Sequence, residues 1–167
     1  MVKDSNKNGG SRVQFYILAV IIVLADHISK WWIVKNMEIG EQIPVIENVF
    51  YITSHRNTGA AWGILAGQMW FFYIITTIVV ITVIYYIRKY ARTSKWMGLA
   101  LALILGGALG NFIDRLFRKE VVDFFDIYFG SYDYPIFNVA DSALVCGVVI
   151  VLIMTFFDEK KKGRTTE

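Results

Sequence analysis

The sequence predicts an all-α membrane protein with four transmembrane helices and a small β-structured segment outside the membrane. Three observations carry this prediction. The 167-residue chain is 56% hydrophobic and only 19% charged, whereas soluble domains are usually about 45–50% apolar and about 25% charged. Its apolar residues gather in four long runs, and most of its Lys and Arg residues flank those runs. No basic stripe with interleaved aromatic residues indicates nucleic-acid binding, so we expect membrane lipid and no nucleic acid as a partner.

Each apolar run is long enough to cross a bilayer, because about 20 mostly apolar helical residues span the hydrocarbon core. The runs are roughly Val13–Val34, Met69–Ile87, Trp96–Phe117 and Ile136–Phe157. A cleaved signal peptide is the alternative for the first run, but no small-residue cleavage site follows Phe15–Ala25. The single cysteine, Cys146, allows no internal disulfide, and its place in the fourth run predicts a buried thiol.

The positions of Lys and Arg predict the orientation of the chain, since cytoplasmic loops carry an excess of these residues. They are abundant in both tails and in the loop between the second and third runs, and sparse in the other two loops. Four spans place the three basic segments on one side, so we expect both termini in the cytoplasm. The predicted organisation is a cytoplasmic tail at 1–12, a membrane domain at 13–157 with extracytoplasmic segments at 35–68 and 118–135, and a cytoplasmic tail at 158–167.

The two extracytoplasmic segments differ in character. The first contains two short β-like runs, Gln42–Ile46 and Val49–Thr53, which predict a small sheet lying on the membrane surface. The second, Lys119–Pro135, is short, acidic and aromatic, and its Gly130 and Pro135 predict a loop.

Seven polar residues of the predicted spans all fall toward the extracytoplasmic side. They are Asp26, Lys30, Asn111, Asp114, Arg115, Asn138 and Asp141. Ionisable groups within a bilayer cost several kcal/mol each and usually face a cavity or a partner. At a rise of about 1.5 Å per residue, Asp141 is expected roughly 7–8 Å beyond the helix start predicted at Ile136.

A polar cluster in one leaflet predicts a site rather than a pathway. A transporter or proton-coupled channel is the competing hypothesis, but it needs polar groups through the whole depth, and the cytoplasmic halves of the runs are apolar. Helical spacing places Asp26 and Lys30 on one helix face, and Asn138 and Asp141 on another.

Residue types narrow the chemistry that such a site could perform. The two histidines, His27 and His55, form no H-E-x-x-H motif, so we expect no metal site. No Gly-x-Ser-x-Gly motif is present, which argues against a Ser–His–Asp arrangement. We also expect no cofactor. Carboxylates are the remaining candidates for the catalytic groups. Two aspartates in a low-dielectric site share one proton near neutral pH, which provides a base and an acid from one residue type.

The candidate carboxylates have different surroundings in the sequence. They are Asp26, Asp114, Asp123, Asp126, Asp133 and Asp141. A structural ion pair with Lys30 explains Asp26, and the neighbouring Arg115 offers a similar explanation for Asp114. Asp141 has no cation within one helical turn, and the spacing leaves open whether Asp123 or Asp126 faces it.

Five short segments, in order along the chain, resemble one protein family. They are Asp26-His27-Ile28-Ser29-Lys30, Asn57-Thr58-Gly59-Ala60-Ala61-Trp62-Gly63, Gly110-Asn111-Phe112-Ile113-Asp114-Arg115, Val121-Val122-Asp123-Phe124 and Phe137-Asn138-Val139-Ala140-Asp141-Ser142. Each segment alone is a weak signal, but the five together resemble lipoprotein signal peptidase, the bacterial type II signal peptidase. The resemblance covers roughly residues 15–157, with His27 standing where Gln is more usual.

The resemblance implies a membrane aspartic endopeptidase that removes signal peptides from diacylglyceryl-modified prolipoproteins, cutting N-terminal to the lipidated cysteine. It implies that Asp123 and Asp141 form a catalytic dyad that activates water. The substrate-binding or supporting residues would be Asn57, Asn111, Arg115, Asn138, Asp26 and Lys30. Residues 37–68 would form a small cradle over the substrate.

The resemblance also implies a location and an inhibitor. We expect a multi-pass protein of the bacterial cytoplasmic (inner) membrane, with its active site near the outer surface, that is inhibited by the cyclic peptide antibiotic globomycin. A third hypothesis is an intramembrane aspartic protease of the presenilin or prepilin-peptidase type, but the Gly-x-Gly-Asp motif of those enzymes is absent here.

Overall fold

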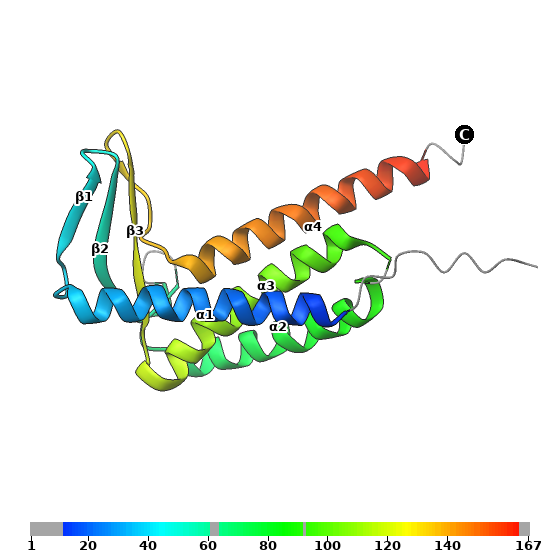
Figure 1. The fold of residues 1–167 in the computed structure, drawn as a ribbon, viewed down its shortest axis with the longest axis horizontal. Helices are drawn as coiled ribbons and strands as arrows, with labels where there is room; N and C mark the ends of the chain where they lie inside the picture. The colour runs from blue at the N-terminus through cyan, green and yellow to red at the C-terminus, as the bar shows by residue number, and fades with distance from the viewer. Residues whose placement is uncertain (1–11, 61–63, 92, 164–167) are drawn as a thin grey trace, which may run out of the picture.

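A computed structural model describes residues 12–60, 64–91 and 93–163, and it contains four long helices beside a small sheet (Figure 1). The helices are α1 (Val13–Asn36), α2 (Met69–Tyr90), α3 (Lys95–Arg118) and α4 (Val139–Gly163). Each is long and apolar enough to cross a membrane. The four predicted spans are therefore confirmed. The predicted tails are largely outside the described residues.

Helix α3 lies at the centre of the bundle. In its most apolar stretch 56% of the residues are buried, against 22% or less in each of the other three helices. Small residues allow this close packing, because a Cβ atom at Gly106 would lie 2.7 Å from Ile22 Cβ of α1. A Cβ at Gly107 would overlap the carbonyl oxygen of Ala140 in α4. The Gly- and Ala-rich sequence of α3 thus fits a helix surrounded by three others.

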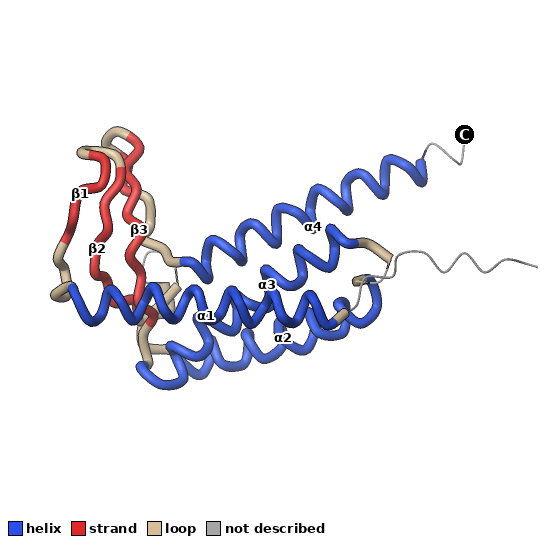
Figure 2. The backbone as a smooth tube through the Cα atoms, viewed as in Figure 1, coloured by secondary structure: helices blue, strands red, loops and turns tan. Residues whose placement is uncertain are grey.

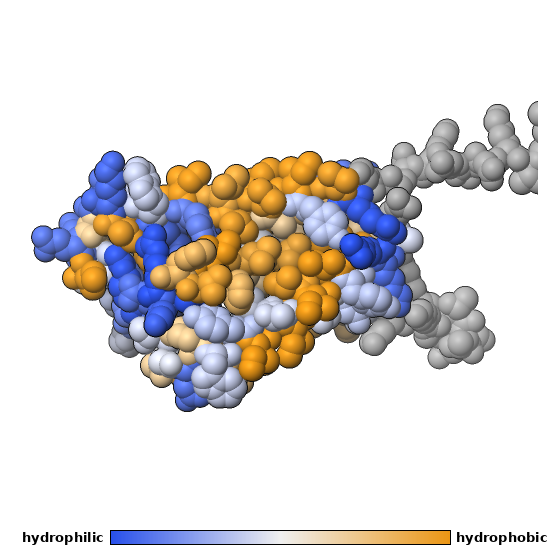
Figure 3. All heavy atoms as spheres, turned by 90° about the horizontal axis from the view of Figure 1, so that it is seen from below, coloured by the Kyte–Doolittle hydropathy of each residue, from blue (hydrophilic) through white to orange (hydrophobic). Residues whose placement is uncertain are grey.

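The outward faces of the helices are apolar. Figure 3 shows hydrophobic residues over the middle of the molecule and hydrophilic residues toward both of its ends. Large exposed side chains on these faces include Ile21, Ile28, Ile78, Ile81, Leu152 and Phe156. The prediction of a buried Cys146 is wrong: its side chain is exposed on α4, on a part of the helix where Val145 and Val149 are exposed as well.

The sheet has four antiparallel strands in the order β1-β2-β3-β4 (Figure 2). The strands are β1 (Gln42–Ile46), β2 (Phe50–Asn57), β3 (Val121–Phe129) and β4 (Tyr132–Asp133). The two predicted strands are present, and β2 extends beyond its predicted end to Asn57.

The prediction of a loop at Lys119–Pro135 is wrong over most of that segment, because β3 and β4 lie there. Strand β3 pairs with β2 from Phe50 opposite Ile127 to Asn57 opposite Val121. Four successive residues of β3, from Val121, are buried, so the strand lacks the alternation of buried and exposed residues that identifies a surface strand.

The sheet sits at one end of the bundle, here called the sheet end. Ile33 and Met37 of α1 pack against Val122 and Phe124 of β3 and join the two parts through a small apolar core. Figure 1 shows that α1 begins and α4 finishes at the opposite end, here called the far end. All the polar residues singled out in the spans therefore lie at the sheet end.

Candidate active site

Asp123 is a buried carboxylate on β3, a short distance along the chain from the end of α3. Its side chain is 2% exposed. Asn138 Nδ2 donates a hydrogen bond to its Oδ1 atom at 2.6 Å, and Asn57 Nδ2 donates to its Oδ2 atom at 3.0 Å. Three distant segments of the chain thus meet at this one carboxylate.

Asp141 is held in the first turn of α4 by a reciprocal capping arrangement. Asn138 Oδ1 accepts a hydrogen bond from the Asp141 backbone N–H at 2.9 Å, and Asp141 Oδ2 accepts one from the Asn138 N–H at 3.2 Å. This pattern is a capping box, which begins a helix. The predicted helix start at Ile136 was three residues early, so Asp141 lies roughly 3 Å, rather than 7–8 Å, from the first residue of the helix.

Asn138 connects the two aspartates. It is fully buried. Its carboxamide donates to Asp123, while its backbone N–H donates to Asp141. Both carboxylates also line one cavity of about 460 Å³.

The sequence left open whether Asp123 or Asp126 faces Asp141, and the geometry of β3 distinguishes the two. Asp126 is three residues beyond Asp123 on the same strand, so its side chain points to the opposite face of the sheet. There it accepts hydrogen bonds from Thr53 Oγ1 at 2.6 Å and from Gln42 Nε2 at 2.9 Å. Asp126 therefore does not share a cavity with Asp141.

The cavity is lined by both polar and apolar side chains. Its polar lining comes from Asn57, Asn111, Arg115, Asp123 and Asp141, and its apolar lining includes Ile75, Val79, Ala108, Leu144 and Val145. The apolar residues come from α2, α3 and α4. No sequence pattern identifies them, because residues lining a cavity look the same in a hydrophobic run as residues facing lipid. Among the described residues no cluster of three or more His, Cys, Asp or Glu side chains could hold a metal ion.

Burial and the neighbouring Asp141 raise the pKa of Asp123 to about 7. Desolvation is the larger cause, since it penalises the charged form of a carboxyl group. The hydrogen bonds from Asn57 and Asn138 act in the opposite direction, because they stabilise the carboxylate. Near neutral pH the site can therefore retain one proton.

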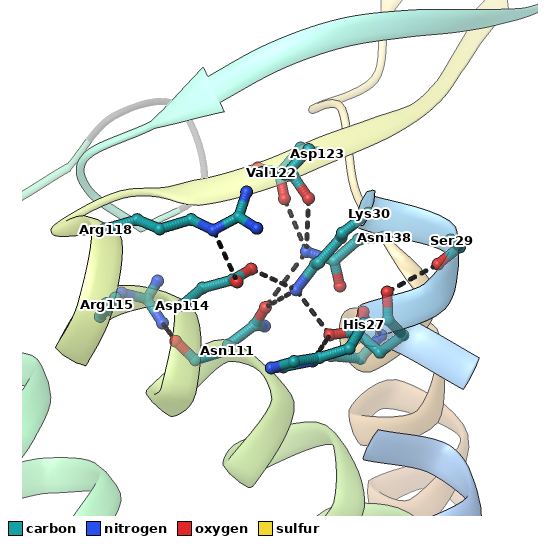
Figure 4. Close-up of polar contacts among 12 residues, drawn as sticks. His27, Ser29, Lys30, Asn111, Asp114, Arg115, Arg118, Val122, Asp123 and Asn138 are labelled. Atoms are coloured by element: carbon teal, nitrogen blue, oxygen red, sulfur yellow. Dashed lines mark hydrogen bonds and ion pairs between the residues drawn. The ribbon is translucent and has the colours of Figure 1, made fainter. Parts of the chain in front are cut away.

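A buried ion-pair network around Lys30 lies beside Asp123 (Figure 4). The Lys30 ammonium is 2.7 Å from Asp26 Oδ2, 2.9 Å from Asp114 Oδ2 and 3.0 Å from Asn111 Oδ1. The Asp26–Lys30 ion pair expected from the sequence is present. Asp114 pairs with Lys30 and, at 3.8 Å, with Arg118 rather than with its neighbour Arg115.

This network reaches the start of α4 at two points. Asn111 Nδ2 donates to Asp141 Oδ1 at 2.7 Å. Asp26 Oδ1 accepts a hydrogen bond from the Ala140 backbone N–H at 2.9 Å, so a side chain of α1 caps α4. No sequence pattern shows this second contact, because it joins residues that are far apart in the chain.

Arg115 holds the segment that follows β2. Its Nη2 atom donates to the Gly59 carbonyl oxygen at 3.1 Å, and its guanidinium lies 4.5 Å from the ring centroid of Phe72. Asn57 and Gly59 belong to one of the five segments noted in the sequence. Residues 61–63 of that segment lie outside the described residues.

Comparison with known proteins gives consistent matches over nearly the whole chain. The profile of a family described as signal peptidase (SPase) II matches residues 18–157. A solved structure of a bacterial membrane enzyme, obtained by the in meso method at 2.3 Å resolution, is 44% identical with a TM-score of 0.87, over 93% of this chain and 94% of that one. A second bacterial membrane enzyme, solved in the same way at 1.9 Å, is 45% identical with a TM-score of 0.81, over 89% of this chain and 96% of that one.

Proposed function

Because this chain belongs to the signal peptidase II family, whose members are aspartic peptidases that cleave lipoprotein signal peptides, we propose that Asp123 and Asp141 form its catalytic dyad. We further propose that its substrates are diacylglyceryl-modified prolipoproteins, cut just N-terminal to the lipidated cysteine. The observation that carries the proposal is that both carboxylates line one cavity and are connected by Asn138. The family membership and four apolar helices fit a multi-pass protein of the bacterial inner membrane.

The chemistry follows from a dyad that holds one proton. With its pKa raised to about 7, Asp123 holds a proton in a substantial fraction of the protein near neutral pH, and that form donates the proton toward the carbonyl oxygen of the scissile peptide bond. Asp141 accepts a proton from water as the water oxygen attacks the carbonyl carbon. Asp141 then passes this proton to the leaving nitrogen as the C–N bond breaks. Asp123 recovers its proton from the intermediate's hydroxyl group as the new carboxyl group forms.

The lining of the cavity suits a peptide that enters from the membrane. The apolar side chains that α2 and α4 contribute would contact the hydrophobic part of the signal peptide, and the polar side chains beside Asp123 and Asp141 would hold the bond to be cut. Arg115 lines the cavity and can donate hydrogen bonds to the substrate backbone, whereas the Asn57 carboxamide already donates to Asp123 and to the Ala60 carbonyl oxygen and so supports the carboxylate. We propose globomycin as an inhibitor that occupies the same cavity.

We also propose that the sheet end faces outward and that both termini are cytoplasmic. The Lys and Arg bias supports this orientation, as does the location of the beginning of α1 and the end of α4 away from the sheet. A diacylglyceryl group anchors its cysteine at the membrane surface, so the bond beside it would lie at the depth of the dyad.

The test is cleavage of a diacylated prolipoprotein by purified protein, with and without globomycin. Asp123→Asn and Asp141→Asn should each lower kcat by at least about 10⁴-fold while the protein stays folded. Asp126→Asn, on the same strand but away from the cavity, is the matched control and should cleave normally. Normal turnover by either dyad variant would disprove the assignment.

A further inference from the structure

Lys30 is a buried cation that contacts two carboxylates and one neutral oxygen atom. The two carboxylates are its ion-pair partners, so the contact with the neutral atom needs a separate explanation. The Lys30 side chain is 1% exposed, and two of its contacts are the carboxylates of Asp26 and Asp114. The third is a neutral atom, Asn111 Oδ1, at 3.0 Å. An ammonium group has three donors and no acceptor, so these three contacts use its full capacity. Lys30 does not line the cavity and cannot meet the substrate directly.

The contacts from Lys30 and Asn138 together determine which way the Asn111 carboxamide points. Its Oδ1 atom accepts from Lys30 and also from Asn138 Nδ2 at 3.1 Å, which leaves Nδ2 to donate to Asp141 Oδ1 at 2.7 Å. Rotating the amide by half a turn would place its NH₂ group against the ammonium. It would also place its carbonyl oxygen against the Asp141 carboxylate. Both contacts are repulsive, because Lys30 can only donate and an ionised carboxylate can only accept.

We propose that Lys30 is a positioning residue for hydrolysis. It holds the Asn111 carboxamide so that an N–H, rather than a carbonyl oxygen, faces Asp141, and it thereby keeps Asp141 in the form that can accept a proton from water. This inference rests on the proposed function, because it assigns Asp141 the role of the base. The titratable and charged groups around the network are Asp26 and His27 from α1, Asp114, Arg115 and Arg118 from α3, Asp123 from β3 and Asp141 from α4.

A direct test must keep the buried charges paired. Lys30→Met alone leaves Asp26 without its cation, and an unpaired buried charge is strongly destabilising. The test therefore starts from Asp26→Asn, in which an amide oxygen at position 26 can still accept the Ala140 N–H. Adding Lys30→Met leaves Asp114 beside Arg118, at 3.8 Å. The difference between the single and the double variant then reports chiefly the loss of the donor to Asn111.

We expect kcat of the Asp26→Asn/Lys30→Met variant to be about 100-fold below that of Asp26→Asn, within the usual contribution of a general base, with KM changed less than about threefold. The acidic limb of its kcat–pH profile should move to higher pH, because an amide carbonyl turned toward Asp141 favours its protonated form. Lys30→Arg keeps a donor-only cation and should retain kcat within about tenfold of the unmodified protein. Equal kcat and equal pH profiles in the single and double variants would overturn the proposal, as would a loss in Lys30→Arg as large as that in the double variant.

A second measurement needs no turnover. In protein labelled with ¹⁵N-asparagine, the short hydrogen bond to Asp141 should shift one Asn111 side-chain NH₂ proton strongly downfield in the Asp26→Asn protein. The double variant should lose that shift, and an unchanged resonance would contradict the proposal. If the unmodified protein fails to cleave prolipoprotein, the proposed function fails. The role of Lys30 in orienting Asn111 is still decided by this resonance.

Discussion

The two ends of the α3–α4 pair are packed in the same way but built from different residues. At the sheet end, Gly107 of α3 allows close contact with the Ala140 backbone, and at the far end Gly147 of α4 allows close contact with the Ala100 backbone. The sheet end surrounds that contact with buried Asp, Lys and Asn side chains. The far end packs apolar side chains such as Leu101 and Leu105 against Phe15, Val83 and Ile87.

The comparison shows that close helix packing does not require the polar cluster. Paired charges in an apolar interior give little net stability, because desolvation offsets their attraction. The far end achieves equivalent contact without them. The polar groups at the sheet end are therefore better explained by chemistry than by stability. An intramembrane pathway would need such groups at both ends, and the buried core described at the far end is apolar.

The largest expected effect is a fall in kcat when the residue that caps α4 is replaced, compared with replacement of the residue that caps α3. Asn138→Ala removes the donor to Asp123 and the cap that holds Asp141, so kcat should fall by about 10³-fold. Ser94→Ala is the control, because Ser94 caps α3 at the far end by accepting the Met97 N–H. Ser94→Ala should lose about 1 kcal/mol of stability, and Asn138→Ala should lose more, because it also leaves Asn111 and Asp123 without a buried donor. Prolipoprotein cleavage and thermal unfolding check the prediction, and a similar fall in kcat for both variants would contradict it.

A smaller effect on kcat is expected from adding a methyl group at the two glycines where α3 and α4 are in close contact. Gly107→Ala forces the start of α4 away from α3, and because Asp141 follows Ala140 directly, kcat should fall by about 100-fold. Gly147→Ala creates a comparable overlap with Ala100 and should cost about 1–3 kcal/mol of stability while leaving kcat unchanged. The comparison fails if Gly147→Ala slows cleavage as much as Gly107→Ala does.

Asn57→Ala should change the pH dependence more than the maximum rate. The Asn57 hydrogen bond lowers the pKa of Asp123, so its loss should raise that pKa above its present value of about 7. Activity in the proposed mechanism ends on the alkaline side when Asp123 loses its proton, so that limb of the kcat–pH profile should move to higher pH. The maximum kcat should fall by no more than about tenfold. Asn36→Ala removes an exposed side-chain hydrogen bond of a residue that does not line the cavity, and it is the control. A limb that stays in place would contradict this role of Asn57.

The smallest expected effect is on stability as a function of pH. A carboxyl group whose pKa is raised from 3.8 to about 7 by folding binds a proton more tightly in the native state. The stability it contributes is fully present below about pH 4 and is lost as the pH rises through about 7. Between pH 5 and pH 8, the melting temperature of the unmodified protein should therefore fall by a few degrees more than that of Asp123→Asn. Parallel curves for the two proteins would disagree with the raised pKa.

Much of the fold could be predicted because a bilayer limits the structures that can cross it. Long apolar runs must become helices in lipid, since every backbone polar group has to be satisfied within its own segment. Strand β3 could not be predicted in the same way. Its stretch from Val121 is buried on both faces, and its ladder is completed by β2, more than sixty positions earlier in the chain.

The sequence by itself determined the four helices and the gathering of polar residues at one end, because periodicity and depth depend on the order of residues alone. The family resemblance pointed to Asp123 and Asp141, and only the tertiary structure placed both at one cavity and Asp126 on the opposite face of the sheet. The capping of α4 by Asp26 and the orientation of Asn111 by Lys30 were also decided by folding. The physical reason is that hydrogen bonds between distant segments depend on how the helices pack, and neither residue spacing nor composition reports that packing.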